Sequence, residues 1–174
     1  MCSSDLYAKP HAAYQSTDLR EVLEDALRIN ITSFDRHGVE IVREYQDIPK
    51  IQADKHLVMQ ILVNLVGNAR NAVRESNSVN RKVTVRLENE LKDEKSFVRV
   101  VVEDNGMGIT TENLTKIFTF GFTTRKNGHG FGLHTAANAA SQMGGTLKAE
   151  SEGPGRGARF ILSLPVECPA LAAA

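Results

Sequence analysis

The strongest periodic pattern in this chain lies between residues 53 and 75, where apolar residues recur every three or four positions. This spacing predicts a helix that opens at Ala53-Asp54, continues to about Glu75 and buries one face. Its inward residues are Leu57, Val58, Ile61, Leu62, Leu65, Val66, Ala69, Ala72 and Val73. Because a helix with one apolar face must pack against another layer, the chain needs a sheet or further helices beside it.

Two more helices and about five strands are predicted around this segment. Asp18 caps a helix that ends near Gly38, and another runs from about Gly130 to Met143. Strands are expected at residues 39–45, 83–87, 97–102, 146–151 and 158–164, and the apolar run at 97–102 is typical of a central strand buried on both faces. The pattern favours an α/β (α+β) two-layer sandwich, with a mixed sheet of about five strands packed against three helices.

The 174 residues suit one domain, which we place at residues 18–166. Residues 1–17 show no periodicity and are predicted to be a linker or lead segment, and residues 167–174 a flexible tail. No apolar run approaches the roughly 18 residues of a membrane span, so a cytoplasmic domain without direct membrane contact is expected. The cysteines, Cys2 and Cys168, fit a reducing compartment better than a disulfide framework.

Charge excludes one class of partner. Lysine and arginine balance aspartate and glutamate at 21 each, so no overall field attracts nucleic acid. Any polyanion must be held by local groups.

A stripe of amides follows the apolar face of the helix at residues 53–75. Gln60, Asn64 and Asn68 are four residues apart, and Asn71 lies on the next turn. Their oxygens suit a hard cation such as Mg²⁺, which shares its shell between protein groups, waters and phosphates. The alternative is an ordinary solvated helix face.

Asp104 ends the apolar strand and is followed by Asn105-Gly106-Met107-Gly108. A carboxylate at a strand end can accept a hydrogen bond from an exocyclic amine, while glycines let the backbone approach a flat ring. Asp-Asn-Gly is also common turn chemistry, so the motif alone leaves both interpretations open.

Residues 105–129 are irregular apart from a possible short helix around Glu112–Phe118. A loop of this length in a compact domain is usually functional or disordered. It leads into Gly128-His129-Gly130-Phe131-Gly132-Leu133, where glycines at a helix start can offer backbone amides to phosphates.

In order, the motifs NLVGNA, DNGMG, IFTFGFTT, GHGFGL and GGTL over residues 50–165 resemble the ATP-binding domain shared by sensor histidine kinases, gyrase and MutL. The resemblance to this superfamily, called GHKL, implies a Bergerat-type fold that binds ATP with Mg²⁺. It implies Asn68 as the metal ligand assisted by Asn64, Asp104 as the adenine anchor, and the segment Asn113–Asn127 as a lid.

The resemblance also implies which residues contact the nucleotide. Gly106 and Gly108 would line the base pocket, and the loop glycines would reach the phosphates. The full expected set is Asn64, Asn68, Asn71, Asp104, Gly106, Gly108, Ile109, Phe118, Thr124, Gly128, His129, Gly130, Phe131, Gly132 and Leu133.

Phe118 and Phe122 look like the aromatic residues of the family lid, either packed on the core or contacting a partner helix. Arg125 or Lys126 is expected to approach the terminal phosphate, the alternative being a solvated surface pair.

Asn64 distinguishes two activities within the superfamily. Relatives that hydrolyse ATP place a glutamate there to activate water, and an amide cannot act as that base. The substitution favours a kinase, with catalytic candidates Asn64, Arg125 and Lys126.

Two positions depart from the family pattern. Ala158 replaces a threonine or serine that supports the adenine-binding aspartate. Asn71 replaces a lysine, which leaves phosphate neutralisation to the lid or to Arg70.

None of the five histidines matches the phosphoacceptor of these kinases, which the family carries on a preceding helical hairpin. The expected function is the catalytic domain of a two-component kinase that phosphorylates a histidine on a separate dimerisation hairpin and, through it, serves a response regulator. It would bind ATP or ADP, be monomeric and show little autokinase activity alone. The alternatives are a nucleotide-dependent interaction module and a GHKL-type ATPase.

Overall fold

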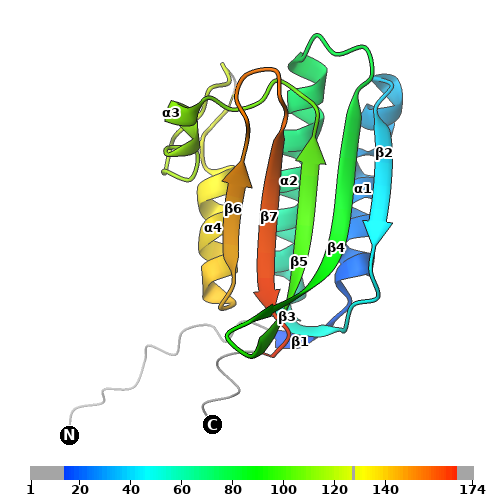
Figure 1. Cartoon of the computed structure of the whole chain (residues 1–174), viewed down its shortest axis with the longest axis vertical. Helices are drawn as coiled ribbons and strands as arrows, with labels where there is room; N and C mark the ends of the chain where they lie inside the picture. Colours follow the sequence, from blue (N-terminus) through cyan, green and yellow to red (C-terminus); the bar gives the residue numbers. More distant parts are fainter. Residues whose placement is uncertain (1–13, 127, 168–174) are drawn as a thin grey trace, which may run out of the picture.

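The chain folds into two layers, a sheet with helices on one of its faces (Figure 1). The computed structural model describes residues 14–126 and 128–167. The predicted lead up to residue 13, the last lid residue Asn127, and the tail from residue 168 lie outside the described residues, as do both cysteines. Within the described ranges, no helix has the length and apolarity needed to cross a membrane.

The main sheet has five strands in the order β2-β4-β5-β7-β6. These are β2 (Glu40–Tyr45), β4 (Lys82–Lys92), β5 (Lys95–Asp104), β7 (Ala158–Pro165) and β6 (Thr146–Glu150). β2 pairs with β4 in parallel and the other neighbours are antiparallel. The predicted mixed sheet of about five strands is confirmed.

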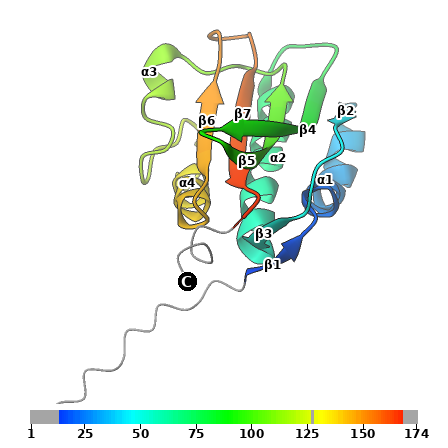
Figure 2. The ribbon, with the colours of Figure 1, turned by 60° about the horizontal axis from the view of Figure 1, so that its bottom comes forward.

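Three long helices, α1 (Leu19–Arg36), α2 (Lys55–Glu75) and α4 (Gly132–Gln142), lie behind the sheet (Figure 2). Asp18 and Asp54 cap α1 and α2 by accepting hydrogen bonds from backbone N–H groups of the first turn. α4 begins later than the predicted Gly130 because Gly130 has φ +72°, which a right-handed helix excludes. A four-residue helix, α3 (Thr111–Leu114), is shorter than the predicted Glu112–Phe118.

Two short strands were not predicted. β1 (Tyr14–Thr17) pairs antiparallel with β3 (Ile51–Asp54) below the main sheet (Figure 2). The expectation that regular structure starts at Asp18 is therefore wrong. The hydroxyl of Thr17 donates to the Ala53 carbonyl at 3.2 Å, which joins the two strands beneath α2.

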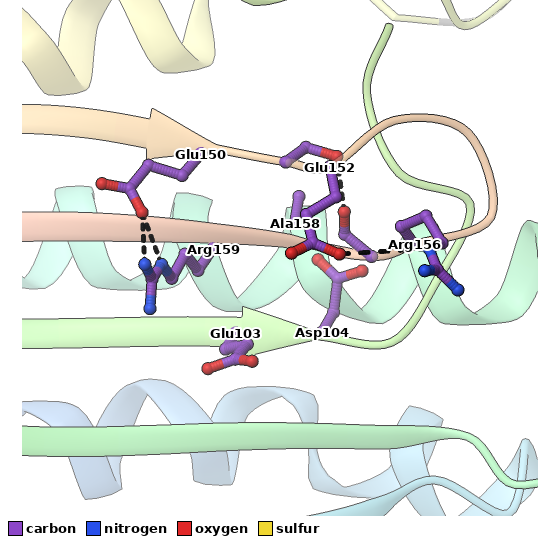
Figure 3. A pocket seen from close by; sticks show the side chains of 9 residues that line it. Glu103, Asp104, Glu150, Glu152, Arg156, Ala158 and Arg159 are labelled. Atoms are coloured by element: carbon purple, nitrogen blue, oxygen red, sulfur yellow. Dashed lines mark hydrogen bonds and ion pairs between the residues drawn. The ribbon is translucent and has the colours of Figure 1, made fainter.

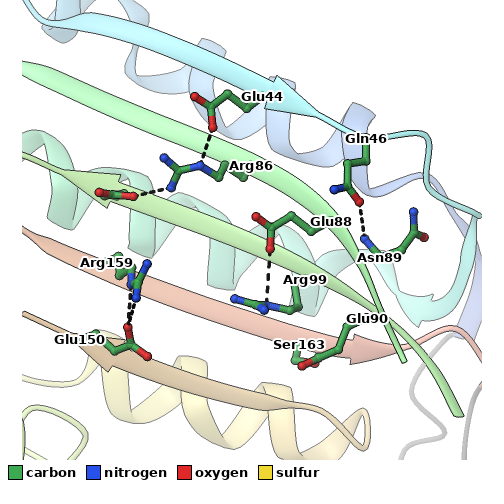
Figure 4. A network of polar contacts seen from close by, with 11 residues as sticks. Glu44, Gln46, Arg86, Glu88, Asn89, Glu90, Arg99, Glu150, Arg159 and Ser163 are labelled. Carbon is green, nitrogen blue, oxygen red and sulfur yellow. Dashed lines mark hydrogen bonds and ion pairs between the residues drawn. The ribbon is translucent and has the colours of Figure 1, made fainter. Parts of the chain in front are cut away.

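β5 is the central strand, as predicted, but it is not apolar on both faces. Val98, Val100 and Val102 are buried on the helix side, whereas Arg99 and Glu103 lie on the uncovered side. Figure 4 shows charged side chains paired across neighbouring strands on that side. The run of valines hides this alternation, because valine suits either face of a strand.

Candidate functional site

A pocket of about 380 Å³ lies between α2, the end of β5 and the segment that leads into α4. Its polar and small residues come from parts of the chain that are distant in sequence. Its wall includes Asn64, Asn68, Ala72, Asp104, Met107, Gly108, Ile109, Thr110, Asn113, Ile117, Phe122, Thr123, Thr124, Arg125, Gly128, His129, Gly130, Gly132, Leu133, Pro154, Ala158 and Phe160.

Asp104 is the buried carboxylate of this pocket, with 5% of its surface exposed. Burial raises the pKa of Asp104 to about 6, although hydrogen bonds from the backbone N–H groups of Gly106 and Ala158 act in the opposite direction. The Gly106 N–H lies 2.8 Å from Oδ1 of Asp104. This geometry fixes the side chain and leaves acceptor capacity for a ligand amine, because a carboxylate offers about four lone-pair sites.

Gly108 brings the loop after β5 against the glycine-rich turn before β7. Its φ is +70°, and a Cβ at this position would lie 2.0 Å from the Gly153 carbonyl oxygen. The Gly155 N–H donates to the Met107 carbonyl at 2.7 Å, and the Ile109 N–H donates to the Ser151 hydroxyl at 3.0 Å. The two loops therefore form one wall beside Asp104.

Gly106 has a different role from the one expected. A Cβ there would lie 2.4 Å from the backbone carbon of Ala72, and the next N–H, of Met107, donates to the Ala72 carbonyl at 3.2 Å. Gly106 thus fits the loop onto α2 and does not line the pocket.

The opposite wall is formed by two asparagines on one face of α2. Nδ2 of Asn68 donates to Oδ1 of Asn64 at 3.0 Å, which leaves Oδ1 of Asn68 available to other groups. From the lid, Nη1 of Arg125 lies 3.4 Å from that Oδ1, and Nη2 lies 3.4 Å from the Asn68 carbonyl oxygen.

This donor set fits Mg²⁺ brought in with a phosphate ligand. An amide oxygen is a hard ligand, and Mg²⁺ usually takes few protein oxygens and keeps waters and phosphates for the rest. Among the described residues, no group of three or more His, Cys, Asp or Glu side chains is placed to form a metal cage of its own.

The start of α4 closes the pocket over Asn64. A Cβ on Gly132 would lie 2.0 Å from Nδ2 of Asn64, so the helix approaches α2 closely. The N-cap residue, Phe131, makes no side-chain hydrogen bond to the first turn. The first N–H groups of a helix have no partner within the helix, and together with the helix dipole they favour an anion at this end.

Comparison with known families matches residues 53–167 to the family described as histidine kinase-, DNA gyrase B-, and HSP90-like ATPase. The chain belongs to this family. Its ATP-binding domain is of the kind found in sensor histidine kinases, and the predicted GHKL resemblance is confirmed.

Several relatives of this ATPase-family domain are named sensor histidine kinases. Sensor histidine kinase ZraS of Klebsiella oxytoca is 37% identical over 163 residues, which cover 93% of this chain and 34% of ZraS. The chain thus spans about a third of that relative's length.

Solved structures of histidine kinases have a similar fold. The nucleotide-free catalytic domain of histidine kinase ThkA superposes with a TM-score of 0.76 at 26% identity, covering 88% of this chain and 98% of that one. ThkA in complex with the response regulator protein TrrA gives 0.71 at 25% identity, covering 88% of this chain and 42% of that one. Full-length ShkA in complex with AMPPNP superposes with a TM-score of 0.73 at 25% identity, covering 88% of this chain and 31% of that one.

Most of the residues expected from the family resemblance meet in the 380 Å³ pocket. They are Asn64, Asn68, Asp104, Gly108, Ile109, Thr124, Arg125, Gly128, His129, Gly130, Gly132 and Leu133. Sequence reasoning missed Met107, Thr110, Thr123 and Pro154. These residues stand next to motif residues in the sequence, but their types do not by themselves indicate a nucleotide site.

Asn71 and Arg70 do not line the pocket. Oδ1 of Asn71 accepts from Nε and Nη2 of Arg70 at 3.3 and 3.2 Å, and Nη1 of Arg70 donates to Oδ1 of Asn30 on α1 at 2.7 Å. Arg70 therefore bridges two helices, so the suggested neutralisation of phosphate by Arg70 is not supported.

Three other expected residues also lie outside the pocket wall. Phe118 packs against the core, as one of the two interpretations predicted, while Phe131 is 45% exposed and stacks on Phe120 with 4.8 Å between ring centres. Lys126 is exposed. Between the two lid cations, Arg125 is the one beside the asparagines.

A larger pocket of about 480 Å³ opens next to Asp104 and Ala158, and Figure 3 shows its charged lining. Its main groups already pair with each other, as Arg159 does with Glu150. It offers neither the amide pair nor the helix start of α4. The smaller pocket is therefore the candidate nucleotide site.

Proposed function

We propose that this chain transfers the terminal phosphoryl group of ATP to a histidine on a dimerisation hairpin of its parent kinase. One observation carries the proposal: the buried Asp104 and the Asn64–Asn68 pair face a single pocket that the start of α4 closes. An adenine amine would bind Asp104 at one end, and the phosphates would lie near Asn68 and the α4 amides at the other.

The protein groups would act by positioning and by stabilising charge. Asp104 accepts a hydrogen bond, the N–H groups of α4 hold phosphate oxygens, and Arg125 approaches the outer phosphate. Magnesium, held by Asn68 with Asn64, would neutralise charge on the phosphates. Since Asn64 is an amide, it cannot deprotonate water, which favours transfer to a histidine over hydrolysis.

The partners follow from this reaction. A response regulator is the proposed downstream partner. In support, histidine kinase ThkA, which has the same fold as this chain, forms a complex with the response regulator protein TrrA. Because the acceptor histidine is proposed to lie on the hairpin, the isolated domain should be monomeric and show little autokinase activity. Because ATP is supplied inside the cell, we propose a cytoplasmic location for the domain.

A nucleotide-dependent interaction module is the second candidate, and the exposed lid aromatics favour it. Phe120 is 66% exposed and lies edge-on to His134 with 5.4 Å between ring centres. Such a surface could bind a partner whose affinity depends on how the lid is ordered by nucleotide.

Calorimetric titration with ADP tests the site. Asp104→Ala should weaken binding by more than about tenfold, because it removes a buried acceptor. Glu103→Ala, which removes the neighbouring carboxylate on the uncovered face, is the matched control and should retain binding.

Phosphotransfer separates the two candidates. The chain, ATP, Mg²⁺ and the hairpin of the parent kinase should yield an acid-labile phosphohistidine. Nucleotide binding with no phosphohistidine, together with nucleotide-dependent partner affinity, would favour the interaction module instead.

A further inference from the structure

Arg125 reaches from the lid onto the face of α2 that carries the asparagines. Its guanidinium contacts both the side-chain and the main-chain oxygen of Asn68, each at 3.4 Å. Its own N–H donates to the Thr123 hydroxyl at 3.1 Å, and Nε lies 3.9 Å from Oε1 of Glu75. With 33% of the side chain exposed, the guanidinium is partly withdrawn from water.

The oxygen that Arg125 contacts is the same oxygen that a metal ion would need. Oδ1 of Asn64 already accepts from Asn68, so Oδ1 of Asn68 is the ligand that this pair presents to the lid. A divalent ion on that oxygen would repel a guanidinium at the same distance. The two cations therefore compete for one position.

Three guanidinium groups, of Arg70, Arg74 and Arg125, lie around this position, against two carboxylates, Glu75 and the buried Asp104. Glu75 is near both Arg74, at 3.5 Å, and Arg125, at 3.9 Å, so one carboxylate serves two guanidinium groups. Among the described residues, Arg70 has amide partners but no carboxylate within salt-bridge distance. Burial and the charges of Arg74 and Arg125 lower the pKa of Arg70. An anion next to Asn68 is thus favoured before any metal is added.

We infer that Arg125 substitutes for the magnesium ion at Asn68, so that nucleotide binds without metal and metal binding displaces Arg125 from this oxygen. The inference rests on the proposed nucleotide site and adds a property to it. Without Mg²⁺, the guanidinium is the counter-cation of the phosphates. With Mg²⁺, the ion takes Oδ1 of Asn68, and the lid arginine is released to approach the γ-phosphate of ATP, a group that ADP lacks.

Calorimetric titration with ADP, in excess Mg²⁺ and separately in EDTA, tests the inference on the whole chain. The wild type should lose no more than about threefold in affinity when Mg²⁺ is removed. Arg125→Gln should bind ADP nearly as well as wild type with Mg²⁺, but lose about tenfold or more in EDTA, because a charge-assisted hydrogen bond is missing there. Lys116→Gln is the control, since this lid-side cation pairs with Glu112 and should behave as wild type.

Two results would overturn the inference while leaving the nucleotide site intact. In one, Arg125→Gln weakens ADP equally with and without Mg²⁺, so that Arg125 is a simple phosphate contact. In the other, the wild type depends on Mg²⁺ as steeply as the variant. Absence of ADP binding by the folded wild type under both conditions would instead remove the proposed function and the inference together.

Discussion

Nη1 of Arg70 on α2 lies 2.7 Å from Oδ1 of Asn30 on α1. Asn30 is 5% exposed, and its Nδ2 donates to the Ala26 carbonyl at 3.0 Å, so both ends of the amide are used inside the helix layer. The contact ties the helix that carries the candidate site to its neighbour through a partly buried cation. Its role is structural, and the first prediction follows from that.

Asn30→Ala should lower the free energy of unfolding by about 1–3 kcal/mol, because the Arg70 guanidinium loses a buried acceptor. Urea denaturation of the purified chain measures this change. Thr32→Ala, at an exposed position of the same helix, should change stability by less than about 0.5 kcal/mol. ADP affinity should be retained in Asn30→Ala, and a loss of binding without a loss of stability would place Arg70 in the site.

Asp104 makes stability depend on pH. Its pKa rises from an ordinary value of 3.8 to about 6 in the fold, so the stability it contributes is complete below pH 3.8 and is lost as pH rises through about 6. Asp104→Asn, which cannot ionise, should therefore be more stable than the nucleotide-free wild type by about 2 kcal/mol at pH 7.5 and about equal to it at pH 4. Urea unfolding at the two pH values checks this, and an equal difference at both would contradict it.

Gly132→Ala should weaken ADP binding more than it weakens the fold. The new Cβ would meet Nδ2 of Asn64 at 2.0 Å, and displacing that side chain breaks its hydrogen bond with Asn68. We expect a loss of about tenfold in affinity by calorimetry.

Gly67→Ala is the matched substitution on α2, where an added Cβ meets nothing within 4 Å. It should retain ADP binding and raise the free energy of unfolding by about 0.5–1 kcal/mol, because alanine is the better helix former. If Gly132→Ala retains full affinity, Asn64 is not needed in its present position.

The β4–β5 turn contains two residues in a backbone region that favours glycine. Asp93 has φ 49° and Glu94 has φ 60°. Glu94→Gly should stabilise the chain by about 1 kcal/mol, since a two-residue hairpin turn of this kind prefers glycine there. Lys92→Gly, one position before the turn in β4, should destabilise it, and thermal unfolding of the two variants distinguishes these outcomes.

The sequence predicted the long helices well because each repeats apolar residues over many turns and two of them begin at an aspartate cap. β1 and β3 escaped notice because a strand of four residues is too short to show alternation. The uncovered face of β5 escaped notice because its valines match either side of a sheet.

The candidate site was predicted best where a residue's chemistry is distinctive. Their types and spacing singled out Asp104, Asn64 and Asn68, the family resemblance supplied their expected roles, and the structure brings them to one pocket. The positions of Gly106 and Asn71 could not be predicted from the sequence. Gly106 packs on the backbone of Ala72, and the side chain of Asn71 accepts hydrogen bonds from Arg70. Such contacts depend on tertiary packing, which no local motif predicts.

The ion pairs on the uncovered sheet face constrain how this domain can change over evolutionary time. Arg86 of β4 pairs with two carboxylates at once, Glu44 on β2 (Figure 4) and Glu103 on β5. Loss of that one arginine would leave both carboxylates without the guanidinium that lies between them. Substitutions at these three positions should therefore be inherited together, and a lineage that replaces Arg86 should also have neutralised at least one of its partners.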